Sequence, residues 1–409
     1  MKTTIEQNES DQSLLDLINR VENKVIESNL RRDKFARLKY LFKKINKKKI
    51  DFLNKVPLLS YSIKRIIYAF ITLYIAIAFV YILIVLSLDD ISVMNDFNFA
   101  RPPVTVGGPE WKEWVKNKKT ALGLDGSLLK QILIYWRNVT PFIPKSIRMP
   151  LRVSHVGITW GNPETKWFWL GLILNKSNGI INYPVMDYFK KAIPISFQIG
   201  VVAVLISYIF GVPIGILAAK NKEKPVDNVI TWWFLILIST PATILISVFW
   251  LIGIKYLNSS GIWGENNYTN FLAIIAVALL LMPPIVIDTR RYVIDEMSSD
   301  YVKFAQSKGL GSIYIFYVHI FRNAGVRIIR LIPGVLVISL FGSSILVERF
   351  WAAPGMSQYI LKGVSTKDVF VVLGYITLSA YVGVFSSLIG DLILVLMDPR
   401  VKLSNNRKE

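Results

Sequence analysis

Cysteine is absent from this sequence of 409 residues, and histidine occurs only twice, at His155 and His319. The lack of cysteine excludes disulfides, thiolate catalysis and cysteine-ligated zinc. Two distant histidines argue against a histidine metal site or a catalytic triad. Long stretches also lack charge, because apolar residues are gathered in blocks of about 20, the length with which a helix crosses roughly 30 Å of hydrocarbon. The sequence therefore predicts a polytopic membrane protein.

Six apolar blocks predict an all-α fold with six transmembrane helices. Lysine and arginine are concentrated before the first block, after the second and fourth, and in the tail, and basic residues favour the cytoplasmic side of a membrane. This pattern predicts a multi-pass protein of the plasma membrane with both termini in the cytoplasm. It also explains the net charge of +20 better than nucleic-acid binding does. The predicted spans cover residues 66–88, 195–218, 229–256, 270–287, 328–348 and 369–396.

The spans divide the chain into five predicted regions. The first of them has no short apolar core with a cleavage site, so it is interpreted as a solvated tail or a segment on anionic lipid rather than a signal peptide. The third is rich in tryptophan and turn residues, which favours a folded unit over a linker. The regions are a cytoplasmic basic N-terminal extension over 1–64, the first span over 65–88, an extracellular insertion over 89–190, a core with five spans over 191–400 and a cytoplasmic tail over 401–409.

Within the insertion, the apolar run at 167–174 is too short to span a membrane. Two interpretations are open: the run lies on the membrane surface, or it packs inside the insertion. The insertion itself is either a docking platform for an external partner or a lid particular to this chain.

The predicted loop between the fourth and fifth spans, residues 288–327, is polar and long for a simple connection. Ser299 is a predicted N-cap for a helix over 300–308, and Gly309 suits the left-handed position that follows a helix. Ser312 is predicted to begin a second helix over 313–322. The alternative is a solvated connector whose caps are incidental. The predicted apolar face of the second helix consists of Ile313, Phe316, Tyr317 and Ile320.

Residues 300–310 read Asp-Tyr-Val-Lys-Phe-Ala-Gln-Ser-Lys-Gly-Leu, and residues 319–324 read His-Ile-Phe-Arg-Asn-Ala. This loop resembles the cytoplasmic loop of binding-protein-dependent ABC importer permeases, in particular the oligopeptide, dipeptide and nickel group. Two features depart from the family pattern: Lys-Phe-Ala stands at 303–305 in place of Glu-Ala-Ala, and the proline that often follows Arg-Asn is missing.

Two further segments carry the same resemblance. Residues 342–356 resemble the outer end of span five in these permeases, and residues 390–401 resemble the C-terminus of their B-type subunit. The resemblance covers about 165–404. It implies a type I ABC importer permease core, so we expect the chain to be a non-catalytic subunit that forms half of a translocation pathway.

The partners that the resemblance implies are a second related permease, two cytoplasmic ATPases, an external substrate-binding lipoprotein, a peptide substrate and membrane lipids, without nucleic acid. No cofactor is expected on this chain, which has no Gly-x-x-x-x-Gly-Lys-Ser/Thr loop, so ATP and Mg would be held by the ATPases. The loop helix at 300–322 would contact the ATPases. The implied coupling residues are Asp300, Tyr301, Ala305, Lys308, Gly309, Leu310, His319 and Asn323. The implied pathway or gate residues are Gly342, Ser343, Glu348, Phe350, Pro354 and Gly355.

Several single residues have competing interpretations. Ala305 would allow a partner backbone to approach, or is simply a good helix former. Glu348 either shapes a gate or sits in interfacial water. Asp391 either pairs with Arg290 or Arg291 or is solvated at a helix end. His319 is expected to pack locally, and residues 283–284, two prolines, are expected to break or kink span four.

Three classes of function are compared. An ATP-driven peptide importer is favoured, and a nickel or other small-solute importer is its alternative within the family. An ion-coupled secondary transporter predicts charges at mid-span and symmetric halves. A membrane enzyme predicts a polar catalytic cluster, and the sequence offers none.

Overall fold

The computed structural model describes residues 57–94 and 105–397, so the predicted tail over 401–409 and nearly all of the extension over 1–64 lie outside the described residues. The chain divides into two compact units, one of residues 1–65 with 400–409 and one of residues 66–399. All packing described below belongs to the second unit.

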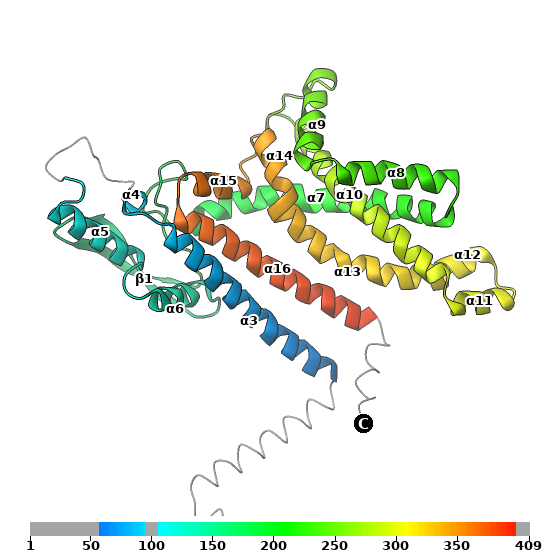
Figure 1. Ribbon diagram of the computed structural model, residues 1–409, viewed down its shortest axis with the longest axis horizontal. Coiled ribbons are helices and arrows are strands. Elements are labelled where there is room, and N and C mark those ends of the chain that lie inside the picture. Colours follow the sequence, from blue (N-terminus) through cyan, green and yellow to red (C-terminus); the bar gives the residue numbers. More distant parts are fainter. Residues whose placement is uncertain (1–56, 95–104, 398–409) are drawn as a thin grey trace, which may run out of the picture. The chain divides into compact units, whose positions relative to one another are not determined.

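Five helices are long and apolar enough to cross a membrane, and a sixth span results if one strongly bent pair is counted as one. The prediction of a helical, multi-span membrane protein is therefore confirmed (Figure 1). The spans are formed, in chain order, by α3 (Pro57–Leu86), α7 (Val185–Lys220), α8 (Pro225–Ser239) with α9 (Ala242–Tyr256), α10 (Asn267–Met297), α13 (Arg322–Ile338) with the π-helical η2 (Ser339–Ser343) and α14 (Ser344–Phe350), and α16 (Val369–Met397).

The third predicted span, over 229–256, is not one continuous helix. Helices α8 and α9 meet at an angle of 102°, which makes a broken span or a re-entrant loop. Thr240, between them, is extended with ψ of 130° because it precedes Pro241, and a residue before proline is disfavoured in the α region. The two prolines at 283–284 have a smaller effect than expected, since α10 runs through both without a break.

Small residues on α7 allow the second and fourth spans to pack closely. A Cβ atom at Gly215 would lie 2.7 Å from both Thr289 Cβ and the Val286 carbonyl oxygen, so only glycine fits this contact. Further along, the hydroxyl of Ser207 donates to the carbonyl of Ala278 at 3.0 Å. Close backbone packing and this interhelical hydrogen bond fix α10 against α7.

Span five crosses α7 at its π-helical segment. The hydroxyl of Ser339 donates to the carbonyl of Gly200 at 3.2 Å, and a Cβ atom at Gly200 would lie 2.8 Å from Leu340. The same helical run extends on both sides of this crossing, over 39 residues from Ser312 to Phe350.

The region between spans one and two contains a β-hairpin that the sequence reading missed. Its two strands are antiparallel, with register from Lys145↔Lys166 to Val153↔Ile158. Both strands contain proline and most of their side chains are exposed, so they lack the apolar alternation that predicts a strand. The elements of this region are α4 (Asp90–Val93), α5 (Pro109–Leu122), α6 (Leu128–Val139), β1 (Lys145–Val153) and β2 (Ile158–Lys166).

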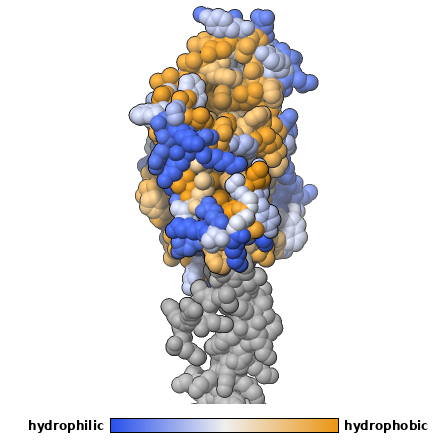
Figure 2. Space-filling model, turned by 90° about the vertical axis from the view of Figure 1, so that its right-hand side faces the viewer, coloured by the Kyte–Doolittle hydropathy of each residue, from blue (hydrophilic) through white to orange (hydrophobic). Residues whose placement is uncertain are grey.

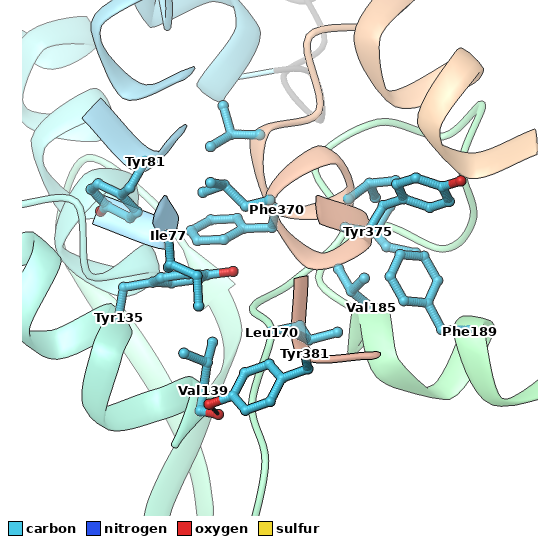
Figure 3. Packing of buried hydrophobic residues seen from close by; sticks show 14 of the residues in the cluster. Ile77, Tyr81, Tyr135, Val139, Leu170, Val185, Phe189, Phe370, Tyr375 and Tyr381 are labelled. Atoms are coloured by element: carbon cyan, nitrogen blue, oxygen red, sulfur yellow. Dashed lines mark hydrogen bonds between the residues drawn. The ribbon is translucent and has the colours of Figure 1, made fainter. Parts of the chain in front are cut away.

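This insertion shares one apolar core with spans one and six, as Figure 3 shows for side chains from α3, α6, α7 and α16. Two hydrogen bonds join α6 to α16: Tyr135 to the hydroxyl of Thr377 at 3.0 Å, and Tyr381 to the carbonyl of Val139 at 2.9 Å. Leu170 and Ile173 are buried in the same core, so the second half of the run at 167–174 packs inside the protein, whereas Trp167 at its start is exposed.

The lengths of the helices explain how the insertion reaches these spans. Helices α3 and α16 have 30 and 29 residues, or about 45 Å each at 1.5 Å per residue. A bilayer core needs only about 30 Å. Each helix therefore has about 15 Å to spare, which is enough to project beyond the membrane and carry the insertion.

Candidate functional site: the loop before span five and the buried acid at its far end

The loop before span five contains two helical segments joined by a glycine turn. Helix α11 (Asp300–Ser307) agrees with the predicted first helix. The second begins as α12 (Ser312–Tyr314), becomes the π-helix η1 (Ile315–Phe321) and continues into α13 without a gap. Because α10 extends to Met297, the loop is shorter than the predicted 288–327.

The first predicted N-cap position and the glycine turn are confirmed, whereas the second predicted N-cap is wrong. Ser299 occupies the N-cap position of α11, although its hydroxyl donates to the carbonyl of Glu296 rather than accepting from the helix. Gly311, not Ser312, occupies the second cap position. Gly309 has φ of +74°, the left-handed conformation that glycine adopts at little cost.

The π-helix changes which residues of the second segment face inward. Ile315, Phe316 and Ile320 are buried, whereas Ile313 and Tyr317 are 74% and 59% exposed. The predicted apolar face assumed 3.6 residues per turn, and a π-turn adds about one residue to each turn. Half of the predicted face therefore points to the outside.

The inner sides of α11 and η1 form one apolar cluster with the ends of α7 and α10. Ala305 and Val302 are buried there, next to Val293 of α10 and Ala219 of α7. Ala305 therefore allows α11 to approach its own neighbours and is not on the outer surface of the loop.

A network of polar groups fixes α11 to spans four and five. The hydroxyl of Tyr301 donates to Glu296 Oε2 at 2.5 Å, and Arg327 donates to Glu296 Oε1 at 2.9 Å. Asn323 also hydrogen-bonds to Tyr301. Burial and the Glu296 carboxylate together raise the pKa of the Tyr301 hydroxyl, so it remains a donor. The loop is thus attached to both spans that flank it.

A second attachment lies nearby, between the first turn of α8 and α10. Arg290 donates twice to the buried Asp227, from Nε at 2.6 Å and from Nη2 at 2.7 Å. Lys220 lies over the ring of Phe316 at 3.9 Å from its centroid, a cation–π contact between α7 and η1. Both basic loops therefore contact each other on this side of the protein.

The outer surface of the loop combines apolar and charged side chains. Figure 2 views this end of the molecule and shows hydrophilic residues gathered around its middle, with apolar surface next to them. Asp300, Lys308 and Gly309 are exposed, and the Lys308 ammonium lies 4.5 Å from the centroid of the Phe304 ring. Exposed apolar side chains around them are those of Phe304, Leu310, Ile313, Tyr314 and Tyr317. We call this set the loop surface.

The far end of span five carries a fully buried acid. Glu348 is 0% exposed, and its carboxylate accepts from the Ser196 hydroxyl at 2.6 Å and from the Ser357 amide at 2.8 Å. A Cβ atom at Gly355 would lie 2.3 Å from the Glu348 Cδ atom, so this glycine is required for close approach. The interpretation that Glu348 sits in interfacial water is therefore wrong: it joins span five to span two and to α15 (Ser357–Ser365).

Only some of the other predicted pathway residues lie near this carboxylate. Phe350 contacts Trp250 of α9, with ring centroids 5.9 Å apart. Gly342 and Ser343 lie in η2, more than a helical turn away along the span. Pro354 is exposed in the turn after α14.

A family model described as the binding-protein-dependent transport system inner membrane component matches residues 211–403. These residues include the loop, the buried acid and spans three to six. Residues 211–403 belong to this permease family. The family description, an inner membrane component of a transport system, agrees with the several candidate membrane spans of this part of the chain.

Individual relatives agree with the family match. The oligopeptide transport system permease protein AmiC of Streptococcus pneumoniae is 32% identical over 208 residues, which are 50% of this chain and 42% of AmiC. The chain thus spans less than half of that relative. The dipeptide transport system permease protein DppB of Lactococcus lactis is 25% identical over 349 residues, 85% of this chain and all of DppB. A chain of the MetNI methionine ABC transporter is 14% identical, with a TM-score of 0.45 over 52% of this chain and 97% of that one.

Two remaining predictions have clear outcomes in the permease. His319 packs locally as expected, with its ring 5.8 Å from that of Tyr314. Asp391 pairs with Arg330 of span five at 3.4 Å. The predicted partners were Arg290 and Arg291, but Arg290 is held by Asp227 and Arg291 pairs with Asp288 at 2.9 Å.

Sequence reasoning missed Glu296, Arg327 and Phe304, although each is a loop or loop-end residue. An acid and a base at the ends of two consecutive helices are a usable signal for an ion pair. The exposure of Phe304 had no such signal, because it depends on which side of α11 the tertiary contacts cover.

Proposed function

We propose that this chain is the membrane-spanning permease subunit of an ATP-driven peptide importer. It forms half of the translocation pathway and receives mechanical work from cytoplasmic ATPases through the loop before span five. The second half of the pathway is a related permease, and an external binding protein delivers the peptide.

The observation that carries this proposal is the rigid attachment of the loop. Helix α11 is tied by Tyr301, Glu296 and Arg327 to the ends of both flanking spans, and the second segment is continuous with span five. A displacement of the loop therefore moves the spans with it. Rigid-body motion of this kind is a common form of alternating access.

The loop surface suits a protein partner. Its apolar side chains are exposed without a covering element, and they are bordered by charged groups, as in the core and rim of an interface. The partner we propose is the ATPase. Asp300, Lys308 and Leu310 would contact it directly, whereas Ala305, Gly309, His319 and Asn323 position the segments that do.

The orientation follows from the same proposal. The loop and the tail are placed on the cytoplasmic side and the insertion on the external side, where it would be a docking platform for the binding protein. Peptide is proposed as the substrate because the names of AmiC and DppB state oligopeptide and dipeptide transport.

Copurification tests the proposal. The tagged chain is expected to retain a second permease and two ATPases, and the double variant Phe304→Asp with Ile313→Asp should lose the ATPases at least tenfold while keeping the second permease. Val156→Asp is the matched control, because Val156 is 85% exposed but lies in the hairpin region rather than the loop. Peptide uptake into vesicles that lack ATP, or retention of the ATPases by the double variant, would overturn the proposal.

A further inference from the structure

A cavity of about 530 Å³ lies at the end of span five opposite to the loop. Its lining comes from helices α14 and α15 and the turn between them, and includes the buried Glu348. Its volume is in the range of small-molecule sites, which is roughly 300–1,000 Å³. The lining residues are Ile345, Glu348, Arg349, Ala352, Gln358, Leu361, Lys362 and Ser365.

Two of the lining side chains are cations without a carboxylate partner. Arg349 and Lys362 are both exposed, one on α14 and the other on α15, and neither forms an ion pair among residues 57–94 and 105–397. The only acid in the lining is Glu348, whose two oxygens accept from Ser196 and Ser357. The cavity therefore keeps a net charge of +1 even when Glu348 is ionised.

The neutral part of the lining suits a peptide. Ile345 and Leu361 supply apolar surface for a side chain. Gln358 donates its amide to the carbonyl of Ala353, which leaves its Oε1 as an acceptor for a peptide N–H group. The cavity thus combines an anion site, an apolar wall and a backbone-like acceptor.

The turn that forms the rim is held in a costly conformation. Ala352 has φ of +50°, a left-handed value that is uncommon for a residue other than glycine. Its neighbours hold it there: Trp351 is buried, its carbonyl accepts from the Trp263 amide at 2.7 Å, and the Ala353 amide donates to the Glu348 carbonyl at 2.9 Å. Strain that is fixed by its surroundings is found most often at functional sites.

We propose that Arg349 and Lys362 bind the C-terminal carboxylate of the peptide as it enters the permease. The C-terminal carboxylate is the one anionic group that every free peptide has, whatever its sequence. A guanidinium binds a carboxylate through two parallel hydrogen bonds, and an ammonium adds a second charge. This inference rests on the proposed function and specifies which part of the substrate the permease reads.

The test compares one peptide in two forms, with a free C-terminal carboxylate and with a C-terminal amide. ATP-driven uptake is measured in proteoliposomes that hold the complete transporter and its binding protein. Each variant is compared with the wild type separately for each peptide. A preference of the binding protein for one of the peptides therefore does not affect the comparison.

The double variant Arg349→Gln with Lys362→Gln should raise the half-saturating concentration of the free peptide at least about tenfold, because the loss of a single charge-assisted hydrogen bond already has an effect of that size. Uptake of the amide should change less than twofold. Arg349→Lys should retain the preference for the free peptide over the amide, because it keeps the positive charge. Lys176→Gln is the matched control, since Lys176 is an exposed cation away from the cavity.

Equal losses for both peptides, or no loss for either, would overturn the inference. Equal losses are also the result expected if the two cations bind lipid phosphate instead. A wild-type transporter that imports neither peptide with ATP would instead refute the proposed function. The single variants replace the double variant if copurification shows that the double variant does not assemble.

Discussion

Replacing Glu348 with alanine removes the acceptor of two buried donors, the Ser196 hydroxyl and the Ser357 amide. A hydrogen bond to a charged group contributes about 1.5–3 kcal/mol, so the loss of two of them in Glu348→Ala should lower the free energy of unfolding by about 3–6 kcal/mol. Gly355→Ala should lower it by about 2–3 kcal/mol, because the new Cβ atom lies 2.3 Å from the Glu348 Cδ atom and must displace the carboxylate.

The two substitutions are predicted to be strongly coupled. Once Glu348 is alanine, the space that the Gly355 substitution needs is empty, so the double variant should lose about as much as Glu348→Ala alone. Unfolding in mixed micelles titrated with SDS, followed by tryptophan fluorescence, gives the four values of the cycle. Gly334→Ala is the control, because nothing lies within 4 Å of its Cβ position. Losses that add to within about 0.5 kcal/mol would refute the geometry.

Three further predictions concern other contacts. Gly215→Ala should cost about 2–3 kcal/mol in the same SDS titration, because its Cβ would lie 2.7 Å from Thr289, and a neutral result would contradict the close packing of α7 and α10. Asp227→Ala should cost about 3 kcal/mol by leaving Arg290 unpaired, and restoration by the second change Arg290→Met would show that the lost pair is the cause. Hydrogen bonds from the Ser92 hydroxyl, from Lys367 and from the Ser92 amide hold the pKa of Asp89 well below its usual range. The contacts of the ionised Asp89 are therefore complete above about pH 4 and are lost as the pH falls through the lowered pKa of Asp89. Hydrogen exchange of the Ser92 amide should stay slow down to about pH 4. Asp89→Asn should abolish this pH dependence.

Much of the fold could be predicted from the sequence because single segments carry the signal. A run of about 20 apolar residues has few alternatives to a membrane span, and Gly309 has a local preference for the left-handed turn that it makes. The bend at Thr240 was also visible locally, since Pro241 disfavours a helical residue before it. Pro241 thus indicated a break at this point, but the apolar composition on both sides favoured a single span.

The candidate site was less predictable because its residues depend on tertiary contacts. Ala305 and Phe304 are neighbours on one short helix, yet one is buried and the other 61% exposed. The sequence suggested Arg290 and Arg291 as partners of Asp391, whereas the packing of span six against span five selects Arg330. The segment was correctly predicted to be helical, but the π-helical geometry of η1 changes which of its residues face inward.

The helical run of span five has 39 residues, or a length of about 58 Å, with the loop surface at one end and the cavity lined by Arg349 and Lys362 at the other. It is fixed to α7 where Ser339 and Leu340 meet Gly200, about two thirds of the way from Ser312 to Phe350. When a rigid helix rotates about a fixed contact along its length, its two ends move in opposite directions. A rigid rotation about this contact would move the cavity end less than half as far as the loop end, and in the opposite direction, whereas bending at the π-helical η2 would reduce the motion that reaches the cavity.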